Sequence, residues 1–429
     1  MQKRSLLTIF IIVFVDLLGF GLILPLLPFY AEQFGASATV IGLLVASYAA
    51  AQLVGAPILG RLSDRFGRRP ILLVSLAGTF VGFLMLGFAP SLGTMLAASL
   101  RPADAGLAST LTLAILFASR ILDGLTGGNI SVAQAYITDV TDASNRARGL
   151  GLIGAAFGLG FIIGPALGGT LSVLGFAVPA FAAAGLSFIN LILVFAWLPE
   201  SLTAERRQAL EVQARPPFTL GAMLGALRRP RVGPLLHIRV FFGLASSMFQ
   251  TIFALYAQSR LGLTAQSTGY VLTYVGVLAV VVQGFGVGWL TARYPERWII
   301  FVSTAVMSAS LLAWAFVPSV GVLLVVLAPL SAATGTLNTV INSALTKVVY
   351  PEEVGGTLGL SASLESLTRV VSPSAGGLLL QQVGAWAPGV FSALIMAWVV
   401  SFAWRRLIAR PDAPLPPRMG EAAARPARA

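Results

Sequence analysis

The chain has 429 residues, of which 57% are hydrophobic and only 10% charged, and a formal net charge of +12. A soluble protein of this size could not cover so much apolar surface, so the composition indicates an integral membrane protein. The chain has no cysteine and a single histidine, His237, which excludes disulfides and thiolate metal sites and argues against a histidine-built metal site or a Ser-His-Asp triad.

Apolar runs predict twelve membrane-spanning helices. In chain order they cover residues 6–30, 38–60, 70–89, 109–138, 148–173, 176–198, 234–258, 267–291, 298–317, 320–346, 355–381 and 388–408. The expected fold class is an all-α membrane protein with two six-helix bundles, residues 1–198 and 234–408. A polar cytoplasmic linker, 199–233, joins the bundles, and a disordered cytoplasmic tail, 409–429, follows them.

The positive charge predicts topology. Most Lys and Arg residues fall on one side of the membrane if both termini are cytoplasmic, whereas Arg120, Arg239 and Arg369 lie within spans. We therefore expect a multi-pass protein of the inner or plasma membrane. The charge is split among loops and tails, so it favours contact with anionic lipid and not with nucleic acid.

The first span carries one carboxylate, Asp16, in the segment VDLLGFGLILPLLP. At ~1.5 Å per residue it lies about 15 Å into the span, away from Lys3 and Arg4 at the membrane edge. Burial favours the neutral acid, and an approaching cation favours the carboxylate. Asp16 is therefore predicted to be a proton switch, with a structural hydrogen bond in a water-filled crevice as the alternative.

Between spans two and three, the stretch GRLSDRFGRRP (Gly60 to Pro70) concentrates four arginines and an aspartate. Its glycines allow a tight turn, and Asp64 could sit at a helix N-terminus, where the dipole favours a carboxylate. A phosphate-binding loop is excluded, because there is no lysine in a G-x-x-x-x-G-K-[ST] pattern. Arginines that merely fix topology are the alternative to a specific role.

Span four places Arg120 near the membrane middle. An ionised side chain there costs at least ~2.5–3.5 kcal/mol unless it is partnered or hydrated. Asp123, three residues on, lies on the same helix face and could neutralise it without excluding a role in coupling.

Span five contains glycines and a proline spaced as G-x8-G-x3-G-P-x2-G-G. The residues are Gly151, Gly160, Gly164, Pro165, Gly168 and Gly169. A glycine face lets helices pack closely, and the proline removes a backbone hydrogen bond and bends the helix. Ordinary tight packing explains the glycines but not the complete spacing.

Span eleven carries Glu365 and Arg369 at i,i+4, which favours an intrahelical ion pair. The alternative is that Glu365 binds a cationic drug or a second proton. Arg369 and the uncharged groups Asn129, Gln250 and Asn338 are candidates to line a substrate cavity, although hydrogen bonds between helices are the commoner fate of such amides.

The two halves are similar in sequence. Residues 163–171 align with 371–379 at an offset of 208, and residues 60–70 align with 288–298 at an offset of 228. In the second copy Ala292 replaces Asp64 and Glu296 replaces Arg68. We therefore expect only the first copy to form a cytoplasmic latch, whose residues are given below. The difference between the offsets predicts an extracytoplasmic loop insertion between about Ser91 and Thr110.

These motifs resemble the major facilitator superfamily. Gly60 to Pro70 is similar to its signature cytoplasmic loop, and Arg120 to Asn129 resembles its motif around an intramembrane arginine. The span-five glycines resemble the antiporter motif of drug:proton exporters, and the Asp16 segment resembles the first helix of tetracycline and multidrug exporters. The resemblance implies the twelve-helix major facilitator fold, two pseudo-symmetric six-helix bundles with a substrate site between them.

The resemblance also implies roles for residues. Proton coupling would rest on Asp16, Arg120, Asp123 and Glu365. A cytoplasmic latch that holds the outward-facing state would consist of Gly60, Asp64, Arg65, Gly67 and Arg68 with Asp139.

The predicted function is export of lipophilic drugs or antibiotics in exchange for protons by alternating access. No enzyme activity, cofactor or metal is expected, and the partners are a lipophilic substrate, protons and membrane lipids around a monomer. A proton-coupled importer or facilitator of a small nutrient, and a non-transporting membrane sensor, are the alternatives.

Overall fold

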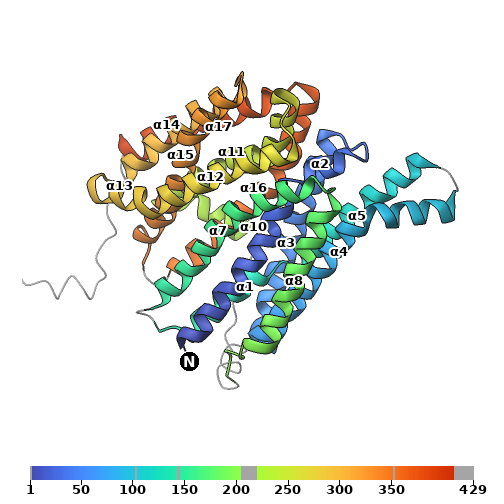
Figure 1. The fold of residues 1–429 in the computed structure, drawn as a ribbon. Coiled ribbons are helices and arrows are strands. Elements are labelled where there is room, and N and C mark those ends of the chain that lie inside the picture. The colour runs from blue at the N-terminus through green and yellow to red at the C-terminus, as the bar shows by residue number, and fades with distance from the viewer. Residues whose placement is uncertain (1, 102–103, 143–144, 204–219, 351–352, 410–429) are drawn as a thin grey trace, which may run out of the picture.

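The computed structural model in Figure 1 describes residues 2–101, 104–142, 145–203, 220–350 and 353–409, which form helices and no strand. The N-terminal half contains α1 (Gln2–Ile23), α2 (Leu27–Glu32), α3 (Ala38–Phe66), α4 (Arg68–Leu100), α5 (Ala105–Thr126), α6 (Asn129–Val140), α7 (Arg146–Ser172) and α8 (Ala177–Trp197). The C-terminal half contains α11 (Val232–Leu261), α12 (Ala265–Val281), the π-helix η1 (Val282–Gly286), α13 (Val287–Arg293), α14 (Glu296–Ala315), α15 (Val320–Lys347), α16 (Val354–Gln382), α17 (Ala387–Ala403) and the π-helix η2 (Trp404–Ile408).

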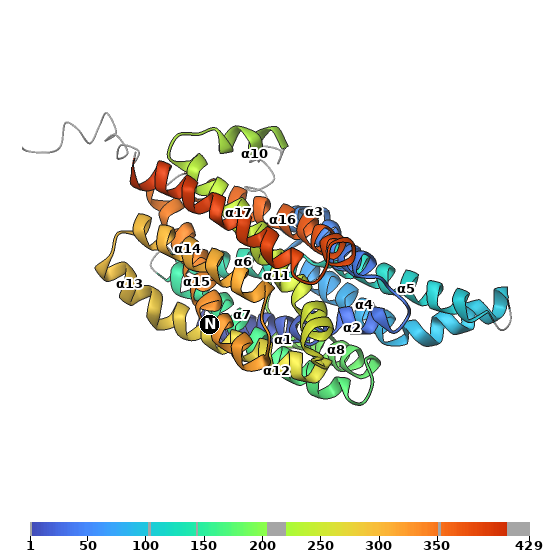
Figure 2. The ribbon, with the colours of Figure 1, turned by 90° about the horizontal axis from the view of Figure 1, so that it is seen from above.

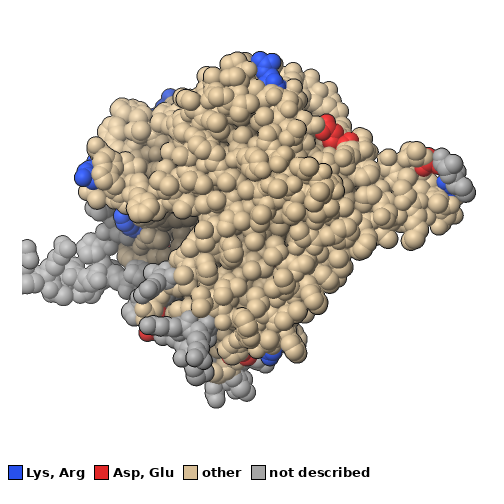
Figure 3. Space-filling model, viewed as in Figure 1, with Lys and Arg blue, Asp and Glu red and all other residues tan. Residues whose placement is uncertain are grey.

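Eleven helical segments of the described chain are long and apolar enough to cross a membrane. The remaining predicted span, 355–381, corresponds to α16, which is long enough but less apolar because it carries Glu365 and Arg369. Figure 3 shows a broad face almost free of charged side chains, as a lipid-facing surface requires. All twelve predicted spans thus have a helical counterpart.

Side-chain caps begin several of these helices. The side-chain oxygens of Ser37, Asp104, Thr264 and Ser319 accept a backbone N–H from the first turns of α3, α5, α12 and α15. Such caps satisfy N–H groups that have no partner within the helix.

Four predicted spans differ from the helices of the structure, and the third of them in the chain, 70–89, is described in the next paragraph. The first is not continuous to residue 30, because α1 ends at Ile23 and the short helix α2 follows. The second does not end at residue 60, because α3 continues to Phe66. The fourth is broken at Gly127–Gly128, where α5 ends and α6 begins. Hydropathy averaged over a window does not locate such helix ends, because a short polar stretch or a pair of glycines changes the mean little.

The predicted loop insertion is a helical hairpin. α4 runs on to Leu100 and α5 begins at Ala105, and the pair projects at the right of Figure 1. α4 packs closely on α5 at Gly93, whose position leaves no room for a Cβ against Thr112. The extra residues therefore lengthen two packed helices.

The linker between the halves contains a helix that hydropathy did not predict, α10 (Leu220–Leu227), which lies at the outer edge of the C-terminal half in Figure 2. Residues 204–219 of the linker and 410–429 of the predicted tail lie outside the described residues. The boundaries at 198, 233 and 408 therefore stay predictions.

Two turns mark the ends of the bundle. At Gly35, between α2 and α3, φ is +76°, and at Gly67, between α3 and α4, φ is +107°. L side chains rarely adopt either value, so glycine is required at both. We call the corresponding ends of the molecule the Gly35 end and the Gly67 end.

Contacts between the halves lie toward the Gly35 end. The Thr39 N–H of α3 donates to Gln381 Oε1 of α16 at 3.2 Å, and Gln258 Nε2 of α11 donates to Glu32 Oε2 of α2 at 2.6 Å. α7 of the N-terminal half also packs against α12 of the C-terminal half.

Toward the Gly67 end the halves separate. A Cβ added at Gly60 of α3 or at Gly355 of α16 would have no described atom within 4 Å. Figure 3 shows an indentation between the upper and lower lobes at the left of the view. The gap between the halves therefore opens at the Gly67 end.

Candidate functional site

Asp16 lies on α1 opposite the break between α5 and α6. Asn129, the first residue of α6, donates a hydrogen bond from Nδ2 to the Asp16 carboxylate, and its Oδ1 accepts the N–H of Ile130 at 2.9 Å. The break at Gly127–Gly128 thus brings an amide to the acid predicted to carry protons. Asp16 as a residue is partly exposed.

Arg120 and Asp123 form the expected intrahelical pair on α5. Nη1 of Arg120 lies 3.1 Å from Asp123 Oδ2, and both side chains are buried. The guanidinium also lies over the Phe83 ring, 5.3 Å from its centroid. Asp123 is held against α4, where a Cβ at Gly82 would meet its Cβ at 3.1 Å. The two charges therefore neutralise each other, as their i,i+3 spacing in the sequence predicted.

A small cavity lies beside this pair. It measures ≈ 20 Å³ and is lined by Phe20, Ile23, Leu24, Leu27, Val45, Tyr48 and Arg120. That volume holds about one water molecule. Tyr48 of α3 interacts electrostatically with Asp16, Asp123, Arg120 and, from the other half, Arg369. These charges therefore share one region between the halves.

The C-terminal half contains a second charged group around Glu365. Arg369 Nη2 donates to Glu365 Oε1 at 2.8 Å, which is the expected i,i+4 pair. Glu365 Oε2 accepts a hydrogen bond from Arg239 of α11, and Arg239 Nη1 donates to Asn338 Oδ1 of α15 at 2.7 Å. Arg239 was not among the predicted site residues; the only sequence signal was a basic residue inside an apolar span.

The two charged groups are built in a similar way, each with an amide bonded to a charged side chain. Asn129 and Asn338 are 209 residues apart, close to the repeat offset of 208, and each bonds a charged side chain on the first long helix of its half. That side chain is the acid Asp16 in one half and the base Arg239 in the other. At the offset of 228 that holds before the insertion, Asp16 aligns with Leu244, so Asp16 and Arg239 are not equivalent positions of the repeat.

Gln250 is not part of either group. Its Nε2 donates to Ser246 Oγ of the same helix at 3.2 Å, on the Gly35 side of Arg239. Among the four predicted cavity residues, the structure thus joins Asn129 to Asp16 and both Asn338 and Arg369 to the Arg239–Glu365 group.

Three of the predicted latch residues, Asp64, Arg68 and Asp139, form a buried cluster at the Gly67 end. Arg68 lies 2.6 Å from Asp64 Oδ1 and 2.9 Å from Asp139 Oδ2, and its own side chain is 5% exposed. The sequence suggested that Asp64 could sit at a helix N-terminus. It does not, because α3 continues past it to Phe66. The ion pairs are present, whereas the latch role stays a prediction.

Two predicted latch residues lie outside the cluster. Arg65 has its guanidinium over the Phe66 ring, and Gly60 has no close neighbour. Sequence reasoning missed Glu200, whose carboxylate accepts the N–H groups of Arg68 and Arg69 at 2.9 and 3.1 Å. It supplies the anion that the N-terminus of α4 favours, from a segment 132 residues away.

The second half also has an ion pair at the equivalent place, whereas the expectation that only the first half forms a latch stays a prediction. Lys347 Nζ lies 2.7 Å from Glu296 Oε1, and Ser343 Oγ donates to the same oxygen at 2.6 Å. Glu296 aligns with Arg68 at offset 228, and Lys347 aligns with Asp139 at offset 208. The repeat has exchanged the two signs, so a search for a second aspartate could not find it.

The antiporter-motif glycines of α7 divide between two neighbours. Added Cβ atoms at Gly160 and Gly164 would meet α1 at Leu17 (3.0 Å) and Gly21 (2.7 Å), and Gly168 faces Leu22. Gly169 instead faces Gln266 of α12, in the other half, at 3.1 Å. Gly151 has open space. The motif packs α7 against the helix that carries Asp16.

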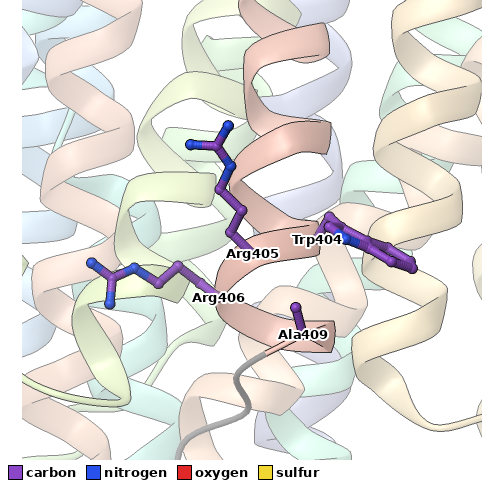
Figure 4. Close-up of a pocket in the computed structure, with 4 residues that line it drawn as sticks. All are labelled: Trp404, Arg405, Arg406 and Ala409. Atoms are coloured by element: carbon purple, nitrogen blue, oxygen red, sulfur yellow. The ribbon is translucent and has the colours of Figure 1, made fainter.

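A hollow of ≈ 590 Å³ lies elsewhere, at the Gly67 end of α17, where Trp404, Arg405, Arg406 and Ala409 line it. Figure 4 shows Trp404 and Arg406 pointing to opposite sides of the π-helix. The Trp404 ring packs on Phe301, 5.4 Å between centroids. This hollow contains none of the predicted site residues.

Comparisons with known proteins agree with this architecture. The family model of the Major Facilitator Superfamily matches residues 9–287 and 235–429. Solute carrier family 22 member 18 of Mus musculus is 32% identical over 389 residues, 89% of this chain and 90% of that protein. Tetracycline resistance protein, class C, of Escherichia coli is 31% identical over 405 residues, 94% of each chain.

The fold is also found among solved structures. The human organic anion transporter MFSD10 (TETRAN) matches with a TM-score of 0.65 at 23% identity, covering 94% of this chain and 99% of that one. The length, the helices and the sequence similarity agree over nearly the whole chain. The chain therefore belongs to the Major Facilitator Superfamily and is a multi-pass membrane transporter, not an enzyme.

Proposed function

We propose that this transporter exports lipophilic compounds in exchange for protons by alternating access. The observation that carries the proposal is the surroundings of Asp16. Its carboxylate bonds Asn129 at a helix break, and the residue after it, Leu17, packs directly on the antiporter-motif glycine Gly160. A change in the charge of Asp16 can therefore act on both α6 and α7.

The arrangement supports a coupling route. α7 touches α1 through Gly160 and Gly164 and touches α12 of the other half through Gly169. A shift of α1 that follows protonation of Asp16 would reach the contact between the halves through a single rigid helix. Substrate that enters from the open side would favour ionised Asp16, and protonation from the other side would favour its release.

Orientation follows from the positive-inside rule, which places both termini and the Gly67 end in the cytoplasm. The gap then faces the cytoplasm, from which an exporter collects its substrate. The similarity to a tetracycline resistance protein, at 31% identity, supports export of drug-like compounds.

The test is proton-driven uptake of a fluorescent lipophilic dye into inverted membrane vesicles. We expect Asp16→Asn to abolish uptake driven by the gradient and to leave exchange of internal for external dye intact, because the neutral side chain mimics the protonated acid. The matched control is Asp104→Asn, since Asp104 caps α5 and asparagine caps equally well. Undiminished gradient-driven uptake in Asp16→Asn would contradict the proposal.

A further inference from the structure

Arg369, a charged side chain inside a predicted span, is exposed. The side chain of Arg369 is 58% exposed although it bonds Glu365, whereas Arg239, on the other side of Glu365, is 5% exposed. An ionised group in a span is tolerated where it faces a water-filled or substrate-filled space and not lipid. Which way Arg369 faces therefore determines its role.

The lipid-facing side of α16 is marked by Leu367, Val371 and Leu378, which are exposed and apolar. At about 100° per residue, Arg369 lies about 160° around the helix from both Leu367 and Val371. Arg369 therefore points away from the lipid.

The face that carries Arg369 is the one that meets the other half. Pro373 and Gly377, one and two turns on, contact Gly42 and Ala38 of α3. The two helices run antiparallel, so this register places Arg369 level with Ala46, next to Tyr48. The guanidinium thus lies where the contact between α3 and α16 ends and the gap toward the Gly67 end begins.

The two walls of this gap carry opposite charge. On the C-terminal side Arg239 and Arg369 face a single carboxylate, Glu365, which leaves one positive charge in excess. On the N-terminal side Asp16 and Asp123 face the single base Arg120, which leaves one negative charge in excess when Asp16 is ionised. Glu365 is already bonded by two arginines, so it offers no free carboxylate to a cationic compound.

We propose that the transported compounds are lipophilic zwitterions, whose anionic group binds the Arg369 guanidinium and whose cationic group faces Asp16. The inference rests on the proposed export function and names its substrate class. A planar guanidinium with several N–H donors suits a carboxylate, and only one acceptor oxygen of Glu365 occupies it. The excess charges on both walls are then matched by one molecule.

The test compares two dyes that differ in one group. Tetramethylrhodamine carries a carboxylate and is a zwitterion, whereas its methyl ester is a cation with the same ring system. Binding of each to the purified full-length protein in lipid nanodiscs is measured by fluorescence anisotropy at neutral pH. We expect the wild type to bind the acid about tenfold more tightly than the ester, the size of one charge-assisted hydrogen bond.

Variants locate the effect. Arg369→Gln should weaken binding of the acid about tenfold and leave binding of the ester unchanged, and Glu365→Gln should strengthen binding of the acid by releasing the arginines. Arg405→Gln removes an exposed arginine outside the gap and should change neither. Equal affinity of the wild type for the two dyes, or an unchanged affinity of Arg369→Gln for the acid, would overturn the inference.

The readout is independent of proton coupling. If the acid is preferred through Arg369 but Asp16→Asn retains gradient-driven uptake, proton exchange fails and the anion site stands. If Asp16→Asn loses uptake but the wild type does not distinguish the two dyes, the substrate class is wrong and proton exchange stands.

Discussion

At the scale of residues, the two ion pairs of the Gly67 end occupy equivalent positions but differ in burial. Arg68 is 5% exposed and bonds two aspartates, whereas Lys347 is 65% exposed and bonds Glu296 alone. Removing one partner of a buried pair leaves an uncompensated charge, while an exposed pair contributes little. The reversed pair therefore contributes much less to the stability than the Arg68 cluster.

Stability measurements separate the two pairs. We predict that Arg68→Gln lowers the free energy of unfolding by ~3–5 kcal/mol, because Asp64 and Asp139 lose their shared cation. Lys347→Gln should lower it by less than ~1 kcal/mol. Thermal unfolding of the purified variants in one detergent gives the order, and equal Tm values would contradict it.

At the scale of elements, α7 packs closely against α1 at Gly164 but has open space at Gly151. Gly164 lies against Gly21 so closely that a methyl group would sit 2.7 Å from its Cα, whereas Gly151 faces open space. Both glycines belong to the same sequence motif. Only the environment of each shows which one the contact with α1 requires.

Alanine substitutions use this difference. Gly164→Ala should push α1 away and reduce both thermal stability and transport, because backbone lies on the other side and cannot yield cheaply. Gly151→Ala should be neutral or stabilise the helix by up to ~1 kcal/mol. Melting temperature and dye transport are measured for both, and a greater loss in Gly151→Ala would show that the packing argument is wrong.

At the scale of the whole molecule, the halves meet at the Gly35 end and part toward the Gly67 end. The antiparallel register of α3 and α16 places Gly60 level with Gly355, yet neither has a close neighbour in this conformation. The proposed alternating access requires these helix ends to approach each other while the Thr39–Gln381 contact breaks.

The absence of native cysteine makes this testable by cross-linking. In a variant that carries both Thr39→Cys and Gln381→Cys, a short thiol cross-linker should join the two positions readily and stop transport. Gly60→Cys and Gly355→Cys should join only in the opposite conformation, so their cross-linking should increase during turnover. Cross-linking is read from gel mobility after cleavage in the linker, and a Gly60–Gly355 pair that never joins would contradict the rocking motion.

Much of the architecture could be predicted from sequence because hydropathy is a one-dimensional property. The number of spans follows from hydropathy, although several bounds do not, and the pairs Arg120–Asp123 and Glu365–Arg369 follow from spacing along one helix. The helix break at Gly127, the helical hairpin of α4 and α5, and the partners Arg239 and Glu200 did not follow. The partners Arg239 and Glu200 depend on residues more than 100 positions away in the chain.

The sequence by itself determined that the chain crosses the membrane many times, which family its motifs resemble and which charges lie within the spans. The spans can be located from sequence because placing a charge in lipid, or apolar surface in water, costs free energy at any position in the chain. Only the tertiary structure decided that Glu365 is bonded by two arginines, that Glu296 and Lys347 repeat the Arg68–Asp139 pair with reversed sign, and that Arg369 faces the gap. Side chains on different helices acquire partners only when packing brings those helices together.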